Sequence, residues 1–567
     1  MTDVASTNAK RQRVVAIGID GGSFRVLRPW MAAGYLPNFA RIAREGAVGT
    51  LMSTIPPLTP PAFVSSMTGK NPGKHNIFDF VRVPRDGYRR SVINSTHVRG
   101  NKLWTILNHY GRKAGIVHFP ASYPPEHIDG FIVGGILTPK GVDSHTWPVE
   151  LADELRREIP GYRIYRGRQH LQGDLDGYLA SLIETTQVHA TEALYLMEKK
   201  EWDFFFLMFK YTDGAKHIYW KFWDKEHPDY PGPNPYEDAI LQVYREVDTY
   251  LGKLLDRLDD DTTLLVYSDH GFMSVHTFIH LQNWLAREGF LTVKTDEQRK
   301  MRTLMAMHHY GFRRDNLVGW LKRHRLGWFP KMFPNAVKDK VPRTRLGMNE
   351  FARFIDWKQT RAYQLAESGR GINLHIKGRE PHGCVPADGP EYESLRSEIM
   401  YRLRDLRDPK TGETVVAEMW TKEEVYSGPY LRNAPDILIE LKKGYCFAEG
   451  FGKDVFVKAA REPFDKSANH ELEGVLFARG PHIRHGVELE PTDVIDIAPT
   501  VLYAMGLPVQ GTMDGRALTE LFDPDHVAAT PVEVDQMDEP ADPEDGYDYS
   551  EDEIGSVQDE LKSLGYL

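Results

Sequence analysis

Short apolar runs alternate with helical patterns from residue 13 to about residue 290 of this 567-residue chain. Strands are predicted at 13–20, 113–118, 130–135, 202–209 and 262–268, and helices at 180–199, at 236–258 and from 62–68 onward. Alternation of this kind is typical of a mostly parallel sheet with helices on both faces. Because such sheets carry their functional groups at the carboxyl ends of the strands, we expect a functional site there.

A basic segment then interrupts the pattern. Between Arg299 and Arg345 there are 13 Lys or Arg residues against two acids, interleaved with the aromatic side chains of Trp320, Trp328, Phe329 and Phe333. We predict a basic, aromatic and largely helical insertion at 297–355, between a first part of the catalytic core at 12–296 and a second part at 356–523. The second part contains predicted strands at 371–377, 436–440 and 474–478 and a predicted helix at 493–505.

The last segment, 524–567, begins as an acidic, Pro-rich stretch that can bury little apolar surface, so we expect an extended tail. It ends in a different pattern, because Val557, Leu561 and Leu564 are spaced as on one face of a helix. We expect a short C-terminal helix that docks on the protein's own body, with a partner surface as the alternative.

Bulk properties exclude some classes of protein. The formal net charge of −10 argues against stable nucleic-acid binding. Only two cysteines occur, Cys384 and Cys446, which is no disulfide framework and favours a reducing compartment. No apolar stretch approaches the roughly 20 residues that cross a bilayer. We therefore expect a cytoplasmic protein that does not span a membrane.

Thr59 is the candidate nucleophile. Pro60 and Pro61 follow it and a helical pattern begins there, so Thr59 is predicted at the N-cap of a helix. The helix N-terminus attracts phosphate and stabilises a deprotonated hydroxyl. A threonine hydroxyl also needs activation by a base or a metal, and without one Thr59 is simply a capping residue.

Polar residues that could supply this activation follow three predicted strands. Asp20 ends the first strand, Asp213 and His217 lie four residues apart after another, and Asp269 and His270 are adjacent at the end of a third. Four-residue spacing places two side chains on one helix face. Burial of paired ionisable groups at strand ends is costly unless they pair or bind a metal.

His470 is a further candidate, in a predicted polar loop just ahead of the strand at 474–478. With it, the set comprises three aspartates and three histidines and no thiolate, which suits Zn²⁺ in a catalytic role, or Mn²⁺ or Fe²⁺. Six ligands and a threonine oxygen are too many for one tetrahedral ion. The set fits two divalent metal ions that clamp the attacking and leaving oxygens of a displacement at phosphorus.

The ordered motifs IGIDGG, PPLTPPAF followed by TGKNPGKHNIFDF, TDGAKH, SDHGF and ANHELEGVLFARGP carry a family resemblance. Together they resemble the type I phosphodiesterase/nucleotide pyrophosphatase family of the alkaline phosphatase superfamily, from about Val14 to Leu521. The resemblance implies an alkaline-phosphatase-like three-layer α/β/α sandwich that holds two metals.

The resemblance also implies roles for these residues. Asp213, His217 and His470 are similar to the ligands of one ion, and Asp20, Asp269, His270 and Thr59 to those of the other. The implied mechanism is attack by a metal-bound Thr59 alkoxide to form a phosphothreonine, followed by hydrolysis with an activated water.

One position departs from the family pattern. Animal nucleotide pyrophosphatases carry an Asn three residues after the nucleophilic Thr, where this chain has Ala62. Nucleotide specificity and that contact to a phosphate oxygen therefore do not carry over. Lys102, Lys216 and the basic insertion are the candidates for replacing the contact.

We therefore predict a metal-dependent phosphodiesterase or pyrophosphatase that acts on a small phosphorylated substrate, with the oligomeric state left open. A phosphomonoesterase or phosphonate hydrolase of the same superfamily is the alternative enzyme. A formylglycine sulfatase needs Cys or Ser in place of Thr59, and phosphoglycerate mutases use Ser. A hypothesis of a different class is an anionic-surface or membrane-binding protein with a vestigial metal site. It draws on the basic, aromatic segment 299–345, which would make peripheral membrane contact. That segment could equally be a solvated lid or a cap over the substrate.

Overall fold

A computed structural model describes residues 11–82, 87–165, 174–297, 351–364, 370–448, 450–459, 464–541 and 546–565. The basic segment 299–345 lies outside the described residues, and so does most of the predicted insertion at 297–355.

A nine-stranded sheet forms the centre of the molecule, in the order β19-β2-β18-β9-β1-β8-β5-β6-β7. Its strands are β1 (Arg13–Ile19), β2 (Ala47–Met52), β5 (Ala114–Phe119), β6 (Gly130–Gly134), β7 (Thr146–Trp147), β8 (Phe204–Phe209), β9 (Thr262–Tyr267), β18 (Glu473–Arg479) and β19 (Val487–Asp493). The strands from β9 to β6 are parallel, whereas β18 runs antiparallel to both of its neighbours. The parallel strands read as continuous apolar runs because both faces of the sheet are covered.

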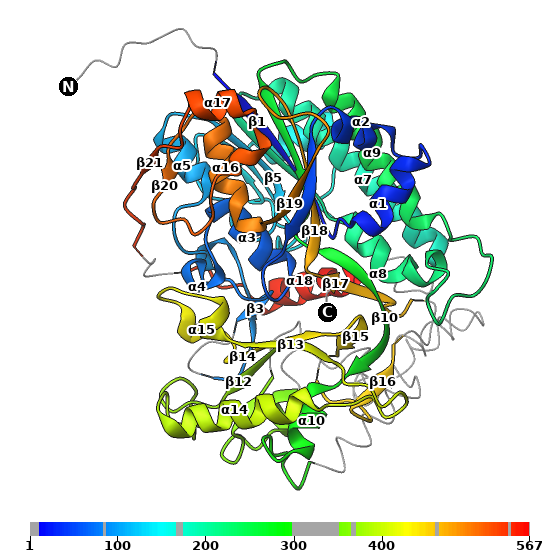
Figure 1. The fold of residues 1–567 in the computed structure, drawn as a ribbon, viewed down its shortest axis with the longest axis vertical. Coiled ribbons are helices and arrows are strands. Elements are labelled where there is room, and N and C mark those ends of the chain that lie inside the picture. The colour runs from blue at the N-terminus through cyan, green and yellow to red at the C-terminus, as the bar shows by residue number, and fades with distance from the viewer. Residues whose placement is uncertain are drawn as a thin grey trace.

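Helices cover the two faces (Figure 1). On one side lie α1 (Phe24–Ala32), α2 (Pro37–Arg44), α7 (Leu175–Lys199), α8 (Tyr211–Trp223) and α9 (Ala239–Leu255). On the other lie α3 (Thr59–Thr68), α5 (Leu103–His109) and α16 (Ile497–Ala504). The predicted α/β/α sandwich with a mostly parallel central sheet is therefore confirmed.

A second, smaller body lies below the main sheet in Figure 1. It consists of α10 (Leu281–Arg287), α14 (Pro390–Arg404) and the four-stranded sheet β11 (Ala362–Tyr363), β12 (Gly371–Leu374), β14 (Ile437–Leu441) and β13 (Val416–Thr421), around a hydrophobic core of its own. The long strand β10 (Gly271–Ile279) leads into it and pairs with β15 (Gly444–Phe447), β16 (Phe456–Lys458) and β17 (Ala468–Glu471).

The packing divides the chain at different points from those expected. Residues 355–451 contribute to the second body's core, and only from Ala468 onward does the chain return to the main core. The segment 356–523 is thus shared between the two bodies. Apolar strand patterns are alike in both bodies, so the sequence does not reveal which sheet a strand joins.

The acidic tail is attached to the main body. It forms α17 (Pro524–Ala529) and β21 (Val534–Asp535), which pairs with β20 (Val509–Gln510), and it ends in α18 (Glu551–Leu564). Along the way Glu539 pairs with the buried Lys70, and the Asn94 amide donates to the Tyr547 carbonyl at 2.5 Å. Val557, Leu561 and Leu564 are fully buried in the main core, as their helical spacing predicted. In the described part of the chain, no helix has the length and hydropathy to cross a bilayer.

We predict that Leu561→Ala lowers the free energy of unfolding by about 2–5 kcal/mol, because it leaves a cavity under α18. Urea or thermal unfolding of the full-length protein measures this. Asp552→Ala on the exposed face of the same helix is the control, and we expect it to cost less than about 1 kcal/mol. Equal stabilities of the two variants would contradict a docked helix.

Candidate active site

The carboxyl ends of three neighbouring strands bring the predicted aspartates together. Asp20 follows β1, Asp213 lies in the first turn of α8 after β8, and Asp269 follows β9, where β1 pairs with both β8 and β9. All three carboxylates are fully buried. The parallel topology places these residues at one edge because equivalent ends of parallel strands meet there.

Two predicted positions differ in local structure. Thr59 is the first residue of α3 rather than its N-cap, which is Leu58. His470 lies in β17 and is buried, instead of standing in a polar loop, because Phe272 of β10 pairs with it. The short run ANHE has no apolar alternation, so the sequence carries no strand signal there.

The first turn of α3 offers fewer backbone N–H groups to a phosphate than expected from the sequence. Pro60 and Pro61 have no N–H, and the N–H of Ala62 donates to the Leu58 carbonyl at 3.0 Å. The first turn therefore offers only the N–H of Thr59 itself. Charge on a phosphate must be stabilised here mainly by other groups.

Asp213, His217 and His470 form one cluster. His217 Nε2 lies 3.1 Å from Asp213 Oδ2, and His470 Nε2 lies 3.2 Å from Asp213 Oδ1. The two Nε2 atoms are 3.2 Å apart. The i, i+4 spacing on α8 and the strand position of His470 direct all three groups to one point.

Thr59, Asp20, Asp269 and His270 form the adjoining cluster. Thr59 Oγ1 lies 3.5 Å from Asp20 Oδ1 and 3.4 Å from His270 Nε2, which is itself 3.2 Å from Asp269 Oδ2. The His270 ring stacks on the His470 ring with a centroid distance of 3.7 Å, so the two clusters are in contact. All seven residues predicted from the sequence therefore lie in one site.

Backbone contacts set the orientation of each imidazole. Nδ1 of His217 lies 2.9 Å from the Ala468 carbonyl, Nδ1 of His270 lies 3.1 Å from the Gly271 carbonyl, and Nδ1 of His470 lies 3.1 Å from the Pro57 carbonyl. A carbonyl only accepts hydrogen bonds, so Nδ1 carries the proton and a neutral ring presents its Nε2 lone pair to the site. This is the arrangement found for metal-binding histidines.

Electrostatics favour neutral histidines and an ionised carboxylate at Asp213, whereas burial opposes ionisation at Asp269. Burial lowers the pKa of His270 and of His470 to about 3, and it also lowers the pKa of His217. Burial opposes ionisation of Asp213, but His217 and His470 together hold its pKa well below the usual range. Burial raises the pKa of Asp269, against the attraction of His270.

The donor atoms of this site fit metal ions. Both carboxylate oxygens of Asp213 and Oδ2 of Asp269 are buried without a hydrogen-bond donor among the described residues. Lone pairs of imidazole nitrogen face these oxygens at about hydrogen-bond distance, an arrangement that is repulsive unless a cation lies among them. Asp213 with His270 and His470, and Asp20 with Asp269 and His270, each bring ligand atoms within 4.8 Å of one another.

Neither lysine proposed to replace the missing Asn is directed at a substrate oxygen. The ammonium group of Lys216 is fully buried and contacts the Gly21 carbonyl and the Tyr244 hydroxyl, the latter at 3.0 Å. Burial lowers the pKa of Lys216 to about 8. Lys102 pairs with Glu126. Ala62 itself is fully buried in α3.

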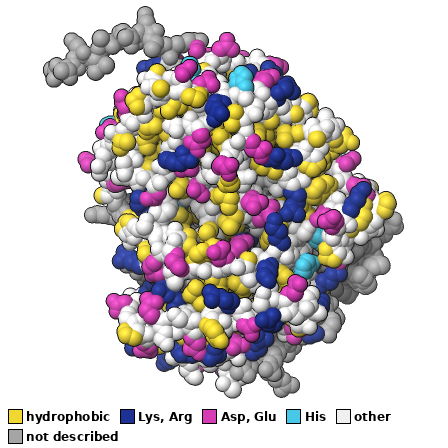
Figure 2. Space-filling view, viewed as in Figure 1, with side chains coloured by type: hydrophobic (Ala, Val, Ile, Leu, Met, Phe, Trp, Pro, Cys, Tyr) yellow, Lys and Arg dark blue, Asp and Glu magenta, His cyan; other side chains and the backbone are white. Residues whose placement is uncertain are grey.

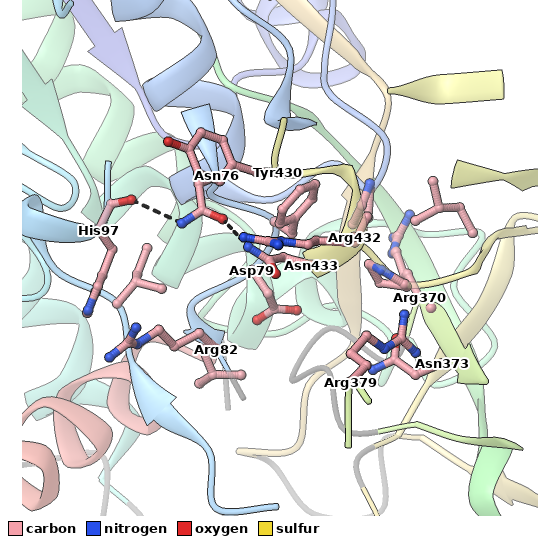
Figure 3. Close-up of a pocket in the computed structure, with 18 of the residues that line it drawn as sticks. Asn76, Asp79, Arg82, His97, Arg370, Asn373, Arg379, Tyr430, Arg432 and Asn433 are labelled. Carbon is pink, nitrogen blue, oxygen red and sulfur yellow. Dashed lines mark hydrogen bonds between the residues drawn. The ribbon is translucent and has the colours of Figure 1, made fainter. Parts of the chain in front are cut away.

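A cavity of about 430 Å³ adjoins the site (Figure 3). Arg370 joins the two, because it lines the cavity while its guanidinium donates to the His470 carbonyl at 2.7 Å and pairs with Glu440. Pro56 also lines the cavity, next to the Pro57 carbonyl that contacts His470.

The cavity wall combines apolar and polar groups, and arginines outnumber acids among its charged side chains. Its charged and amide side chains come from both bodies of the protein: Arg82, Arg99, Arg370, Arg379, Arg432, Asp79, Glu380, Asn76, Asn373 and Asn433. The sequence motifs TGKNPGKHN and GPYLRNAPD contain three of them, Asn76, Arg432 and Asn433, but give none of them a role. Arg370 has no motif around it, and only the tertiary contact with His470 reveals it.

The sequence profile of the type I phosphodiesterase/nucleotide pyrophosphatase family matches residues 14–327, which is more than half of the chain. The protein belongs to this family. It is therefore a hydrolase of phosphoric ester or related bonds within the alkaline phosphatase superfamily, a group that depends on metal ions.

Two solved structures resemble this chain in fold. Phosphonoacetate hydrolase from Sinorhizobium meliloti, in complex with phosphonoformate, has a TM-score of 0.51 at 16% identity, over 88% of this chain and 98% of that chain. Inactive murine ectonucleotide pyrophosphatase/phosphodiesterase 5, in complex with AMP, has a TM-score of 0.47 at 13% identity, over 90% of this chain and 100% of that chain. At these identities the likeness concerns the fold. Among proteins with curated annotation, no match was found.

We predict that Asp213→Ala removes at least one equivalent of bound metal from protein equilibrated with Zn²⁺, since it deletes two buried acceptor oxygens. Metal analysis after gel filtration measures this. Asp248→Asn is the control, because Asp248 is also buried but accepts hydrogen bonds from the N–H groups of Asn38 and Phe39. Equal metal content in the two variants would contradict the assignment.

Proposed function

We propose that this protein is a two-metal phosphodiesterase or pyrophosphatase in which Thr59 is the nucleophile. The observation that carries the proposal is the position of Thr59 Oγ1, within 3.5 Å of Asp20 and His270 and beside the second cluster of Asp213, His217 and His470. A threonine that only began a helix would need none of these neighbours.

The donor set supports two ions. Asp213, His217 and His470 would hold one, and Asp20, Asp269 and His270 with Thr59 the other. Oxygen and neutral imidazole ligands without thiolate favour Zn²⁺, with Mn²⁺ or Fe²⁺ as alternatives. When bound, such ions lower the pKa of hydroxyl and water and neutralise phosphate oxygens.

The chain's own residues position the reacting groups. Asp20 and His270 hold the Thr59 hydroxyl. Its oxygen forms a bond to phosphorus as the bond to the leaving oxygen breaks, and the hydroxyl proton is passed on to the leaving oxygen, which leaves a phosphothreonine. A water then forms a new bond to phosphorus as the bond to the Thr59 oxygen breaks, and a proton of that water restores the Thr59 hydroxyl. Burial of the site excludes bulk water from competing reactions.

The cavity indicates the class of substrate. Five arginines line its wall. Arg370, Arg379 and Arg82 pair with Glu440, Asp436 and Asp548, so the rest of the wall, which includes Arg432, is what favours a leaving group with negative charge or several polar oxygens. Three asparagine amides add hydrogen-bonding capacity. We therefore propose a small phosphodiester or phosphoanhydride with an anionic or polar second group, and we do not extend the proposal to nucleotides. A phosphonate hydrolase or a phosphomonoesterase of the same superfamily is the alternative.

The proposed partners are limited to such small substrates. On the face seen in Figure 2, acidic and basic side chains are interspersed, which supports the absence of stable nucleic-acid binding. The two cysteines are unpaired, which supports a reducing compartment such as the cytoplasm. Peripheral membrane contact through 299–345 remains a proposal from composition alone.

We predict that Thr59→Ala lowers turnover of bis-p-nitrophenyl phosphate by roughly 10³-fold or more, as loss of other nucleophiles does. Thr59→Ser should keep measurable activity because it keeps a hydroxyl. Thr68→Ala is the matched control, since its buried hydroxyl in the same helix donates to the Val64 carbonyl and accepts from the Lys70 N–H. Near-normal turnover of Thr59→Ala would show that another group is the nucleophile.

We also predict that Arg432→Gln raises KM about tenfold for diesters whose second group is anionic, which corresponds to about 1.4 kcal/mol. KM for methyl p-nitrophenyl phosphate should stay unchanged, because its second group is neutral. Arg404→Gln, at an exposed arginine of α14 that does not line the cavity, is the control. If Arg432→Gln changed KM equally for both substrates, Arg432 would not recognise the anionic second group.

A further inference from the structure

A second set of histidine and carboxylate side chains lies at the end of β5, outside the seven residues of the active site. His118 comes from β5, and His189 and Glu192 come from one face of α7, three residues apart. All three side chains are fully buried, and the two imidazole rings stack with a centroid distance of 3.9 Å.

The backbone places His118 there by an irregularity in the strand. The register of β5 against β6 shifts between Val117 and Phe119, and His118 has a φ of 59°, in the left-handed region. A bulge of this kind redirects a side chain relative to the normal alternation of a strand. It orients His118 toward α7, where its Nε2 lies 3.0 Å from Glu192 Oε2.

The hydrogen bonds of this group leave basic atoms without donors. His118 Nδ1 lies 3.3 Å from the Gly134 carbonyl, and His189 Nε2 lies 3.1 Å from the Arg163 carbonyl, so each of these nitrogens carries a hydrogen. His189 Nδ1 and Glu192 Oε1 are then buried with no hydrogen-bond partner among the described residues. Each such orphaned atom costs about 1–3 kcal/mol.

A metal-free account of these contacts is incomplete. A protonated His118 could donate to both Gly134 and Glu192 as an imidazolium–carboxylate pair. That pair would still leave His189 Nδ1 and Glu192 Oε1 unsatisfied, and it would place a positive charge against the stacked ring of His189. The His189 Nε2–H donates to the Arg163 carbonyl, so in the neutral ring the lone pair is on Nδ1, where it is available as a ligand.

We propose that His118, His189 and Glu192 form an additional divalent-metal site, distinct from the proposed catalytic pair of ions. One ligand atom from each residue lies within 4.8 Å of the other two. Two imidazole nitrogens and a carboxylate oxygen are a ligand set suited to Zn²⁺ and related transition-metal ions.

The position of this site indicates a structural role. The His189 ring lies 5.6 Å from the ring of Tyr211, which begins α8 two residues before Asp213. β5 also pairs directly with β8, the strand that leads into α8. An ion held by His118 and α7 would therefore brace the start of α8, and with it a residue of the active site.

The proposal is tested by counting metal in a chain whose active-site ligands are removed. Asp213→Ala, Asp269→Ala and His270→Ala are combined, and the full-length protein is equilibrated with Zn²⁺ or Co²⁺. We expect one equivalent of Zn²⁺ to remain, a Co²⁺ absorption spectrum of a nitrogen- and oxygen-ligated ion, and a rise in Tm on adding Zn²⁺. Adding Glu192→Gln, which preserves shape, should abolish all three.

The outcomes separate this site from the catalytic one. If the active-site-depleted chain bound no Zn²⁺, or kept its equivalent after Glu192→Gln, the proposal would be overturned in favour of a buried ion pair. His189→Phe, which keeps the ring stacked on His118, is the second variant if Glu192→Gln does not fold. If neither folds, the metal content and Co²⁺ spectrum of the depleted chain still decide. Failure of Thr59 as nucleophile would leave these results unchanged.

Discussion

The structure depends on the burial of three carboxylates and three imidazoles at one edge of a parallel sheet. Isolated charges of this kind are expensive to remove from water, and the part of the chain that the structure describes provides no hydrogen bond to Asp213 or to Asp269 Oδ2. The histidine Nδ1 atoms contact backbone carbonyls, so their Nε2 atoms add lone pairs rather than protons to the cluster. The site is thus arranged for cations, and its cost is offset when cations bind.

This constraint explains several features of the surrounding fold. β10 extends directly from the Asp269–His270 pair, and it positions His470 by pairing with β17 before entering the second body. Arg370 of the second body donates to the His470 carbonyl. The cavity lies between the same two bodies. The contact between them therefore both supports His470, a proposed metal ligand, and lines the proposed binding site for substrate. The C-terminal segment adds a further layer, because the Lys466 ammonium donates to the Gly565 carbonyl beside His217.

Two electrostatic environments are therefore adjacent. The cluster at Asp20, Asp213 and Asp269 is acidic and buried, whereas arginine is the commonest charged residue on the cavity wall. A substrate could place its phosphoryl group at the acidic cluster and its other polar oxygens against the arginines of the cavity. The phosphoryl group would be repelled by the carboxylates unless cations neutralise them. The two prolines that follow Thr59 in α3 strengthen this dependence, since they remove backbone donors that phosphate sites often use.

The sequence by itself predicted six strands of the main sheet but not β2, β7 or β19, together with the seven candidate residues of the site and the docking face of α18. These features depend on local patterns, namely strand-end positions, helical spacing and apolar periodicity. Such patterns can be recognised in the sequence without knowing the fold. The tertiary structure decided the rest, namely the strand that carries His470, the second body within 356–523, the role of Arg370 and the meeting of His118 with His189 and Glu192. Each of these features brings together residues that are far apart in the chain. Contacts between such residues produce no periodic pattern and no change of composition in the sequence.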